Sequence, residues 1–143
     1  MPTFDHLVGH RFPSGTFEVS PHRAWLWSHC VEAEPSFEHS HPSLAWFAAM
    51  RGCGVSIAEM LALFEPSPGA DVVLGECDLE LTEPLRVGTT YRIEAAVEKV
   101  VRKSGGSGVF DVIGVRIEVR DPTGALPFSM LNSMIVPRPE ERP

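Results

Sequence analysis

Hydrophobic and polar positions divide this chain into a helical first half and a β-rich second half. From Pro42 to Phe64 the residues are apolar on nearly every face of a helix, and the polar exceptions are Ser43, Arg51, Ser56 and Glu59. A helix of this kind must be covered by the rest of its domain or by a partner. Gly52 and Gly54 predict a break within it.

The second half has the two-residue period of β-strands, with turn residues between the strands. Four strands are expected, over Val72–Leu81, Thr90–Arg102, Val109–Arg120 and Ala125–Val136. The last two are joined by Asp121–Gly124, which has the Pro and Gly placement of a tight turn.

A shorter strand and a short helix are expected before the long helix. The strand covers Thr16–Val19, and Ser20 and Pro21 then supply an N-cap with Pro at the first helical position. The helix is expected to end near Val31, where a loop begins that continues to Ser40.

One long apolar helix followed by four or five antiparallel strands has few compact arrangements, because the sheet must curl around the helix to bury it. We therefore expect an α+β hot-dog fold, in which a long central helix is wrapped by a curled antiparallel sheet. No repeat or linker interrupts the chain, so residues 1–136 are expected to form a single domain and Pro137–Pro143 a flexible tail.

Composition narrows the class of function. The chain of 143 residues carries a net charge of −7 without a basic block, which argues against binding to nucleic acid or anionic membranes. Three cysteines without a CxxC pair make a disulfide framework or a metal site unexpected. Neither a signal peptide nor a run of about 20 apolar residues is present, so a cytoplasmic location is expected.

Several segments resemble the MaoC-like dehydratases and hydratases, including their N-terminal-domain subgroup. They are Val8-Gly9 with Phe12-Pro13, the strand Thr16–Ser20, the turn Glu83–Gly88 before a long strand, and Val119–Gly124 before the last strand. Active members of that family carry an Asp, four residues, then a His, with Pro three and Ala six residues after the His. Here His39, Pro42 and Ala45 match the second half of this pattern, and Glu34 stands in the place of the Asp.

The resemblance implies an (R)-specific enoyl-thioester hydratase, or the 3-hydroxyacyl-thioester dehydratase that runs the reaction in reverse. The substrate would be carried by coenzyme A or an acyl carrier protein, in fatty acid or polyketide metabolism, and no cofactor would be needed. His39 and Glu34 would hold the reacting water between an imidazole and a carboxylate. A backbone N–H at Gly52 or Gly54 would stabilise the developing enolate oxygen.

Other residues have two interpretations. His41, Ser56, Glu59 and Arg86 are candidates for substrate binding, but His41 also suits a loop anchor before the helix that begins at Pro42. Arg86, Arg92, Arg102, Lys103 and Arg116 could bind phosphate groups of the carrier, or could simply be solvated strand residues. Cys53 is expected to be a buried small side chain rather than a nucleophile.

Two alternatives to an active hydratase remain open. Because the Asp is replaced, the chain could be a non-catalytic, substrate-binding subunit of a heterodimeric MaoC-like dehydratase. It could also be a hot-dog acyl thioesterase that uses Glu59. In every case the uncovered side of the helix and the open sheet edge predict a dimer, homo or hetero, that buries about 2,000 Å² or more.

Overall fold

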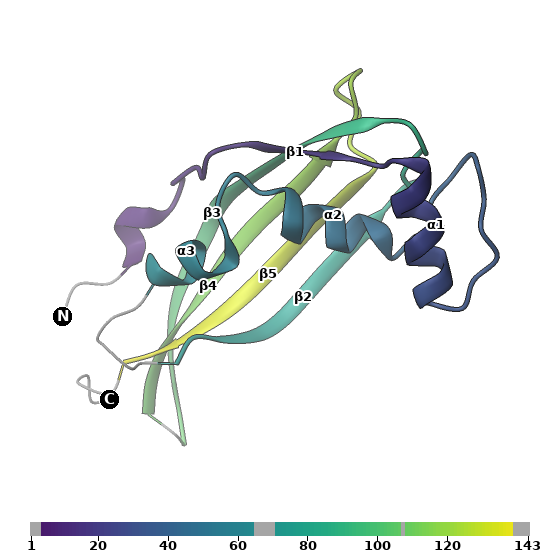
Figure 1. The fold of residues 1–143 in the computed structure, drawn as a ribbon. Coiled ribbons are helices and arrows are strands. Elements are labelled where there is room, and N and C mark those ends of the chain that lie inside the picture. The colour runs from purple at the N-terminus through teal and green to yellow at the C-terminus, as the bar shows by residue number, and fades with distance from the viewer. Residues whose placement is uncertain (1–3, 65–70, 107, 139–143) are drawn as a thin grey trace.

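The computed structural model describes residues 4–64, 71–106 and 108–138 of the chain. Five antiparallel strands form one sheet in the order β1-β3-β4-β5-β2, and the helices lie on one face of it (Figure 1). The strands are β1 (Gly15–Glu18), β2 (Val73–Leu81), β3 (Thr90–Gly105), β4 (Gly108–Arg120) and β5 (Phe128–Pro137). All five predicted strands are therefore confirmed, with ends that differ by a few residues.

The helices are short, and within the described residues all of them come from the first half of the chain. They are the 3₁₀-helix η1 (Phe4–Leu7), α1 (Pro21–Cys30), α2 (Leu44–Gly52) and α3 (Ile57–Ala62). The predicted N-cap is confirmed, because the Ser20 hydroxyl accepts a hydrogen bond of 3.1 Å from the Arg23 N–H, with Pro21 at the first helical position.

The predicted break in the long helix is also confirmed, and it separates α2 from α3. A Cβ on Gly54 would lie 2.2 Å from the Pro13 carbonyl oxygen, and a Cβ on Gly15 would lie 1.9 Å from the Gly52 carbonyl oxygen. The segment leading into β1 thus runs directly against the end of α2. Only residues without side chains allow two backbones to come so close.

Within this chain α2 is covered on one side only, which agrees with the uncovered helix side expected from the sequence. Its small residues Ala45, Ala48 and Ala49 are fully buried against the sheet, together with Leu44. Trp46 on the other side is 42% exposed. Within this chain the sheet therefore covers the alanine side of α2 and leaves a tryptophan open.

The core lies between the concave face of the sheet and the helices. Alternate residues of β3 and β4 point into it, and Met60 and Phe64 close it from α3 and the residues that follow it. This period of two places Arg92, Glu94, Arg116 and Glu118 on the opposite, convex face, whereas Asp111 of β4 is fully buried.

The C-terminal end differs from the predicted tail at its first two residues. Pro137 is the last residue of β5, and the Arg138 N–H donates a hydrogen bond of 2.8 Å to the Val109 carbonyl. The Arg138 side chain is only 3% exposed, and its guanidinium group lies over the Phe4 ring. Residues 139–143 lie outside the described part of the chain, as does Glu65–Ala70 before β2.

Candidate functional site

The loop that precedes α2 is attached to the turn between β2 and β3 by backbone hydrogen bonds. The Ser40 N–H donates to the Leu85 carbonyl at 2.8 Å, and the Val87 N–H donates to the Glu38 carbonyl at 2.9 Å. Between these bonds, His39 and Arg86 form an isolated antiparallel bridge. The match to the MaoC-like pattern therefore falls on a loop whose end is fixed against the sheet.

His39 and Glu34 occupy different environments within this loop. His39 is partly buried, and its backbone N–H donates to the Ser36 hydroxyl at 3.3 Å. Glu34 is exposed, and no hydrogen bond or ion pair joins it to His39 within the described residues. The chain alone does not bring this carboxylate and imidazole together.

His41 takes part in a short chain of hydrogen bonds with Ser43 and Trp27. The Trp27 indole N–H donates to the Ser43 hydroxyl at 2.8 Å, and this hydroxyl lies 2.7 Å from His41 Nδ1. The Ser43 backbone N–H also donates to His41 Nδ1, at 3.2 Å. Because Nδ1 accepts a hydrogen bond from a backbone N–H, the neutral ring carries its proton on Nε2.

An apolar pocket of about 430 Å³ opens beside this group, between the start of α2 and the edge strand β2. We call it the Trp46 pocket; its lining residues are Trp27, Pro42, Ser43, Trp46, Leu79, Leu81 and Phe128. Its volume is typical of a small-molecule site. These residues could not be grouped from the sequence, since four segments that are distant in the chain contribute to the pocket. Its only sequence signal was Trp46, a large aromatic residue among the alanines of α2.

The two glycines proposed as oxyanion donors do not have that role in this structure. Gly52 lies at the C-terminal end of α2, where a helix presents carbonyl groups and not free N–H groups. The Gly54 N–H already donates a hydrogen bond of 3.0 Å to the Pro13 carbonyl. Gly54 is explained by the close approach of the segment before β1. Gly52 is explained by the Ile93 side chain of β3, which would lie 2.5 Å from an added Cβ.

Ser56 and Glu59 form a capping box at the start of α3. The Glu59 N–H donates to the Ser56 hydroxyl, and the Ser56 N–H donates to the Glu59 carboxylate, each at 3.1 Å. These bonds to Ser56 hold the pKa of Glu59 below its usual value. The Ser-x-x-Glu spacing is the sequence signal for such a cap, so a structural role could have been predicted.

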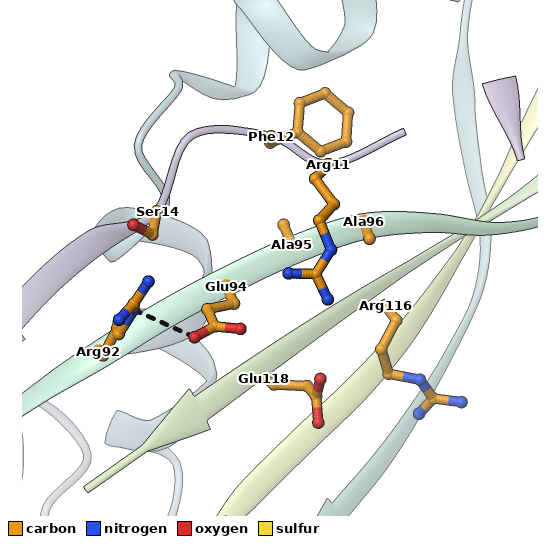
Figure 2. Close-up of a pocket in the computed structure, with 9 residues that line it drawn as sticks. All are labelled: Arg11, Phe12, Ser14, Arg92, Glu94, Ala95, Ala96, Arg116 and Glu118. Carbon is orange, nitrogen blue, oxygen red and sulfur yellow. Dashed lines mark ion pairs between the residues drawn. The ribbon is translucent and has the colours of Figure 1, made fainter. Parts of the chain in front are cut away.

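Most of the candidate phosphate-binding cations are engaged in ion pairs. Arg102 contacts the buried Asp111 at 2.8 Å, and Arg116 contacts Glu98 at 3.1 Å. Figure 2 shows a small polar hollow on the sheet in which the Arg92–Glu94 pair, at 3.1 Å, lies near Glu118. Arg86 remains the candidate nearest the loop, since its backbone pairs with His39 and its side chain is exposed.

Cys53 is not an activated nucleophile. Burial raises the pKa of its thiol to about 11, and the thiol donates to the Ala49 carbonyl at 3.1 Å. A thiol with this pKa is protonated at neutral pH, which agrees with the packing role expected from the sequence.

Within the described residues, no helix is long and apolar enough to span a membrane, and no group of His, Cys, Asp and Glu is arranged to hold a metal ion.

Sequence comparison finds no matching family profile and no matching curated protein. Several solved structures nevertheless have the same fold. A chain of the ChsH1–ChsH2 complex from Mycobacterium tuberculosis superposes with a TM-score of 0.72 at 15% identity, covering 94% of this chain and 88% of that one. A chain of the HadBC (3R-hydroxyacyl-ACP dehydratase) complex from the same organism gives 0.65 at 13% identity, covering 90% and 96%.

A MaoC-like dehydratase from Rhodospirillum rubrum gives a TM-score of 0.57 at 18% identity, covering 100% of this chain and 99% of that one. Two of these three structures are complexes named for two components, and all three are matched over most of their length. At these identities the similarity concerns architecture. The chain has the hot-dog fold found in MaoC-like dehydratases, as its sequence led us to expect.

Proposed function

We propose that this chain binds the acyl group of a thioester as one subunit of an (R)-specific enoyl-thioester hydratase or 3-hydroxyacyl-thioester dehydratase. The observation that carries the proposal is the Trp46 pocket, whose volume of about 430 Å³ and mainly apolar lining suit an acyl chain. The pocket includes Pro42 and Ser43, which directly follow the loop with His39 and His41. The fold shared with a 3R-hydroxyacyl-ACP dehydratase complex supports the same reaction class.

Hydration of an enoyl thioester needs a group that accepts a proton from water, a group that protonates the α-carbon, and a donor for the enolate oxygen. This chain offers the His39 imidazole in a fixed loop. Its carboxylate, Glu34, is exposed, and the Gly54 N–H is already hydrogen bonded. The proposal therefore assigns acyl binding to this chain and the completion of the catalytic set to a second subunit.

A second candidate is that His39 and Glu34 hold the reacting water together within this chain. The backbone bridge between His39 and Arg86 favours it, because a catalytic imidazole must be held in place. In this version the loop residues Pro35–Glu38 move Glu34 toward His39 when substrate binds.

Turnover of the purified chain separates the two candidates. Crotonyl-CoA and longer enoyl thioesters are supplied, and the loss of the conjugated thioester absorbance is followed. The acyl-binding proposal predicts no hydration by the chain alone. Hydration that disappears in both His39→Ala and Glu34→Gln would instead support the second candidate and contradict the first.

Thioester hydrolysis by Glu59 is disfavoured, because its carboxylate caps α3 and lies at the surface. Release of free thiol from acyl-CoA by the wild-type chain, lost in Glu59→Gln, would reverse this conclusion.

A further inference from the structure

The start of α2 places a serine hydroxyl against an imidazole. Ser43 Oγ lies 2.7 Å from His41 Nδ1, which accepts the Ser43 backbone N–H and carries no proton in the neutral ring. The hydroxyl therefore donates its own hydrogen bond to Nδ1. From α1, which lies beside the start of α2 (Figure 1), the Trp27 indole N–H donates to the same oxygen at 2.8 Å. A hydroxyl held against a base in this way can become a nucleophile.

Ser43 also belongs to the wall of the Trp46 pocket, and it alone among the described lining residues carries a hydroxyl group. The rest of the lining is mainly apolar and suits an acyl chain. Ser43 and His41 are both partly buried, so the pair is neither sealed in the core nor fully solvated. A thioester whose chain occupies the pocket can thus present its carbonyl carbon to this hydroxyl.

Two features of the site stabilise negative charge on oxygen. Ser43 directly precedes Leu44, the first residue of α2, so the positive end of the helix dipole lies beside the hydroxyl. The Trp27 N–H is a fixed donor that already points at this oxygen. Donors that are in place before the reaction favour both the alkoxide and the tetrahedral intermediate that it forms.

We propose that Ser43 is a nucleophile that takes the acyl group from a bound thioester, with His41 as its general base. The Ser43 oxygen attacks the carbonyl carbon while His41 Nδ1 takes the hydroxyl proton. The carbon–sulfur bond then breaks, and the sulfur takes the proton from His41 and leaves as a free thiol. Water hydrolyses the ester left on Ser43 to a carboxylic acid and restores the hydroxyl, with His41 again carrying the proton.

The inference rests on the proposed acyl binding in the Trp46 pocket and adds a chemical step that binding does not need. The step is expected to be slow. Within the part of the chain that the structure describes, no carboxylate is hydrogen bonded to the His41 ring, so the pair lacks the third member of a triad. The Ser43 backbone N–H, 3.2 Å from Nδ1, also loses its acceptor when that nitrogen takes a proton.

A purely structural group would use the same hydrogen bonds to fasten the loop to α1, and acylation of Ser43 separates the two roles. The wild-type chain is mixed with octanoyl-CoA and followed by intact-protein mass spectrometry. We expect a mass increase of one octanoyl group and a burst of one free coenzyme A per chain, measured by chromatography. Peptide mapping distinguishes an ester on Ser43 from a thioester on the exposed Cys30.

Three variants test the assigned roles. Ser43→Ala is expected to abolish the ester. His41→Asn keeps a hydrogen-bond acceptor beside Ser43 but removes the base, and it is expected to slow acylation at least about hundredfold. Ser104→Ala, which changes an exposed serine of β3, is the control and is expected to react like wild type. Mapping of the ester in the wild-type chain decides the question even if a variant does not fold.

Tryptophan fluorescence in the same titration reports binding separately from acylation. Saturable binding of octanoyl-CoA without an ester on Ser43 would overturn this proposal and leave the proposed acyl binding intact. Absence of binding would contradict both. Acylation of Cys30 alone, or equal rates of Ser43 acylation in wild type and His41→Asn, would also overturn it.

Discussion

Asp111 is a fully buried carboxylate on β4 that two arginines share. Arg102 binds both of its oxygens, at 2.8 and 3.0 Å, and Arg138 lies 3.4 Å from it. Asp111→Ala leaves cationic groups without their partner at a buried site. We expect the free energy of unfolding to fall by about 2–4 kcal/mol, somewhat below the usual range for a buried pair because Arg102 is partly exposed.

Urea denaturation measures this loss, and Glu94→Ala is the matched control. Glu94 pairs with Arg92, whose side chain is 64% exposed, and its removal is expected to cost less than about 1 kcal/mol. Equal losses in the two variants would show that the Asp111 network contributes no more to the free energy of unfolding than an exposed ion pair does.

The three cysteines are expected to differ in reactivity. Cys30 is exposed, whereas burial raises the pKa of Cys53 from 9.0 to about 11. Alkylation followed by peptide mapping should modify Cys30 first and leave Cys53 largely unmodified until the pH approaches about 11. Rapid modification of Cys53 in the folded protein near neutral pH would contradict this assignment.

The same shift makes stability depend on pH. The folded state keeps a proton on Cys53 that the unfolded chain releases, so its contribution is present below about pH 9 and is lost as pH rises toward about 11.

The structural positions of some residues could be predicted from the sequence, and those of others could not. The register of His39, Pro42 and Ala45 predicted a loop that ends at a helix, and the structure has α2 starting at Leu44. Whether Glu34 approaches His39 depends on loop geometry, which residue spacing does not determine. Asp111 also escaped notice, because an acidic residue in a strand suggests an exposed position until the packing of Arg102 and Arg138 is known.

At the scale of elements, the break between α2 and α3 requires glycine. Gly54→Ala would place a Cβ 2.2 Å from the Pro13 carbonyl oxygen, and a backbone atom cannot move aside as the end of a side chain can. We expect a loss of about 1–3 kcal/mol in the free energy of unfolding.

Gly106→Ala is the control, because nothing lies within 4 Å of its added Cβ. Thermal and urea unfolding of both variants measure the difference. A Gly54→Ala protein as stable as Gly106→Ala would contradict the proposed close approach.

Element type could be predicted from period and capping residues, whereas the arrangement of elements could not. The strands, the cap at Ser20 and the break near Gly52 all follow from local chemistry. The register shift in β2 between Leu74 and Glu76 does not, although it decides which residues of that strand face the core. The apolar pattern predicted a helix covered partly by its domain and partly by a partner, but only tertiary packing shows that the Trp46 side is the one left open in this chain.

At the scale of the whole molecule, the open edge strand β2 borders the proposed acyl pocket. Leu79 and Leu81 are exposed residues of β2 and also line the Trp46 pocket. A partner on β2 would therefore deepen the pocket and exclude water from it. The predicted dimer interface of about 2,000 Å² remains a prediction.

Binding of an acyl thioester to the Trp46 pocket tests the central claim most directly. Butyryl-, octanoyl- and dodecanoyl-CoA are titrated into the wild-type chain while tryptophan fluorescence is followed. Leu79→Glu puts a charge in the pocket, whereas Leu74→Glu changes a residue of the same strand that is equally exposed, at 56%, and lies outside the pocket. We predict saturable binding that needs the acyl chain, weakens at least about tenfold in Leu79→Glu and is unchanged in Leu74→Glu. Equal binding by wild type and Leu79→Glu, or equally tight binding of coenzyme A without an acyl group, would contradict the account.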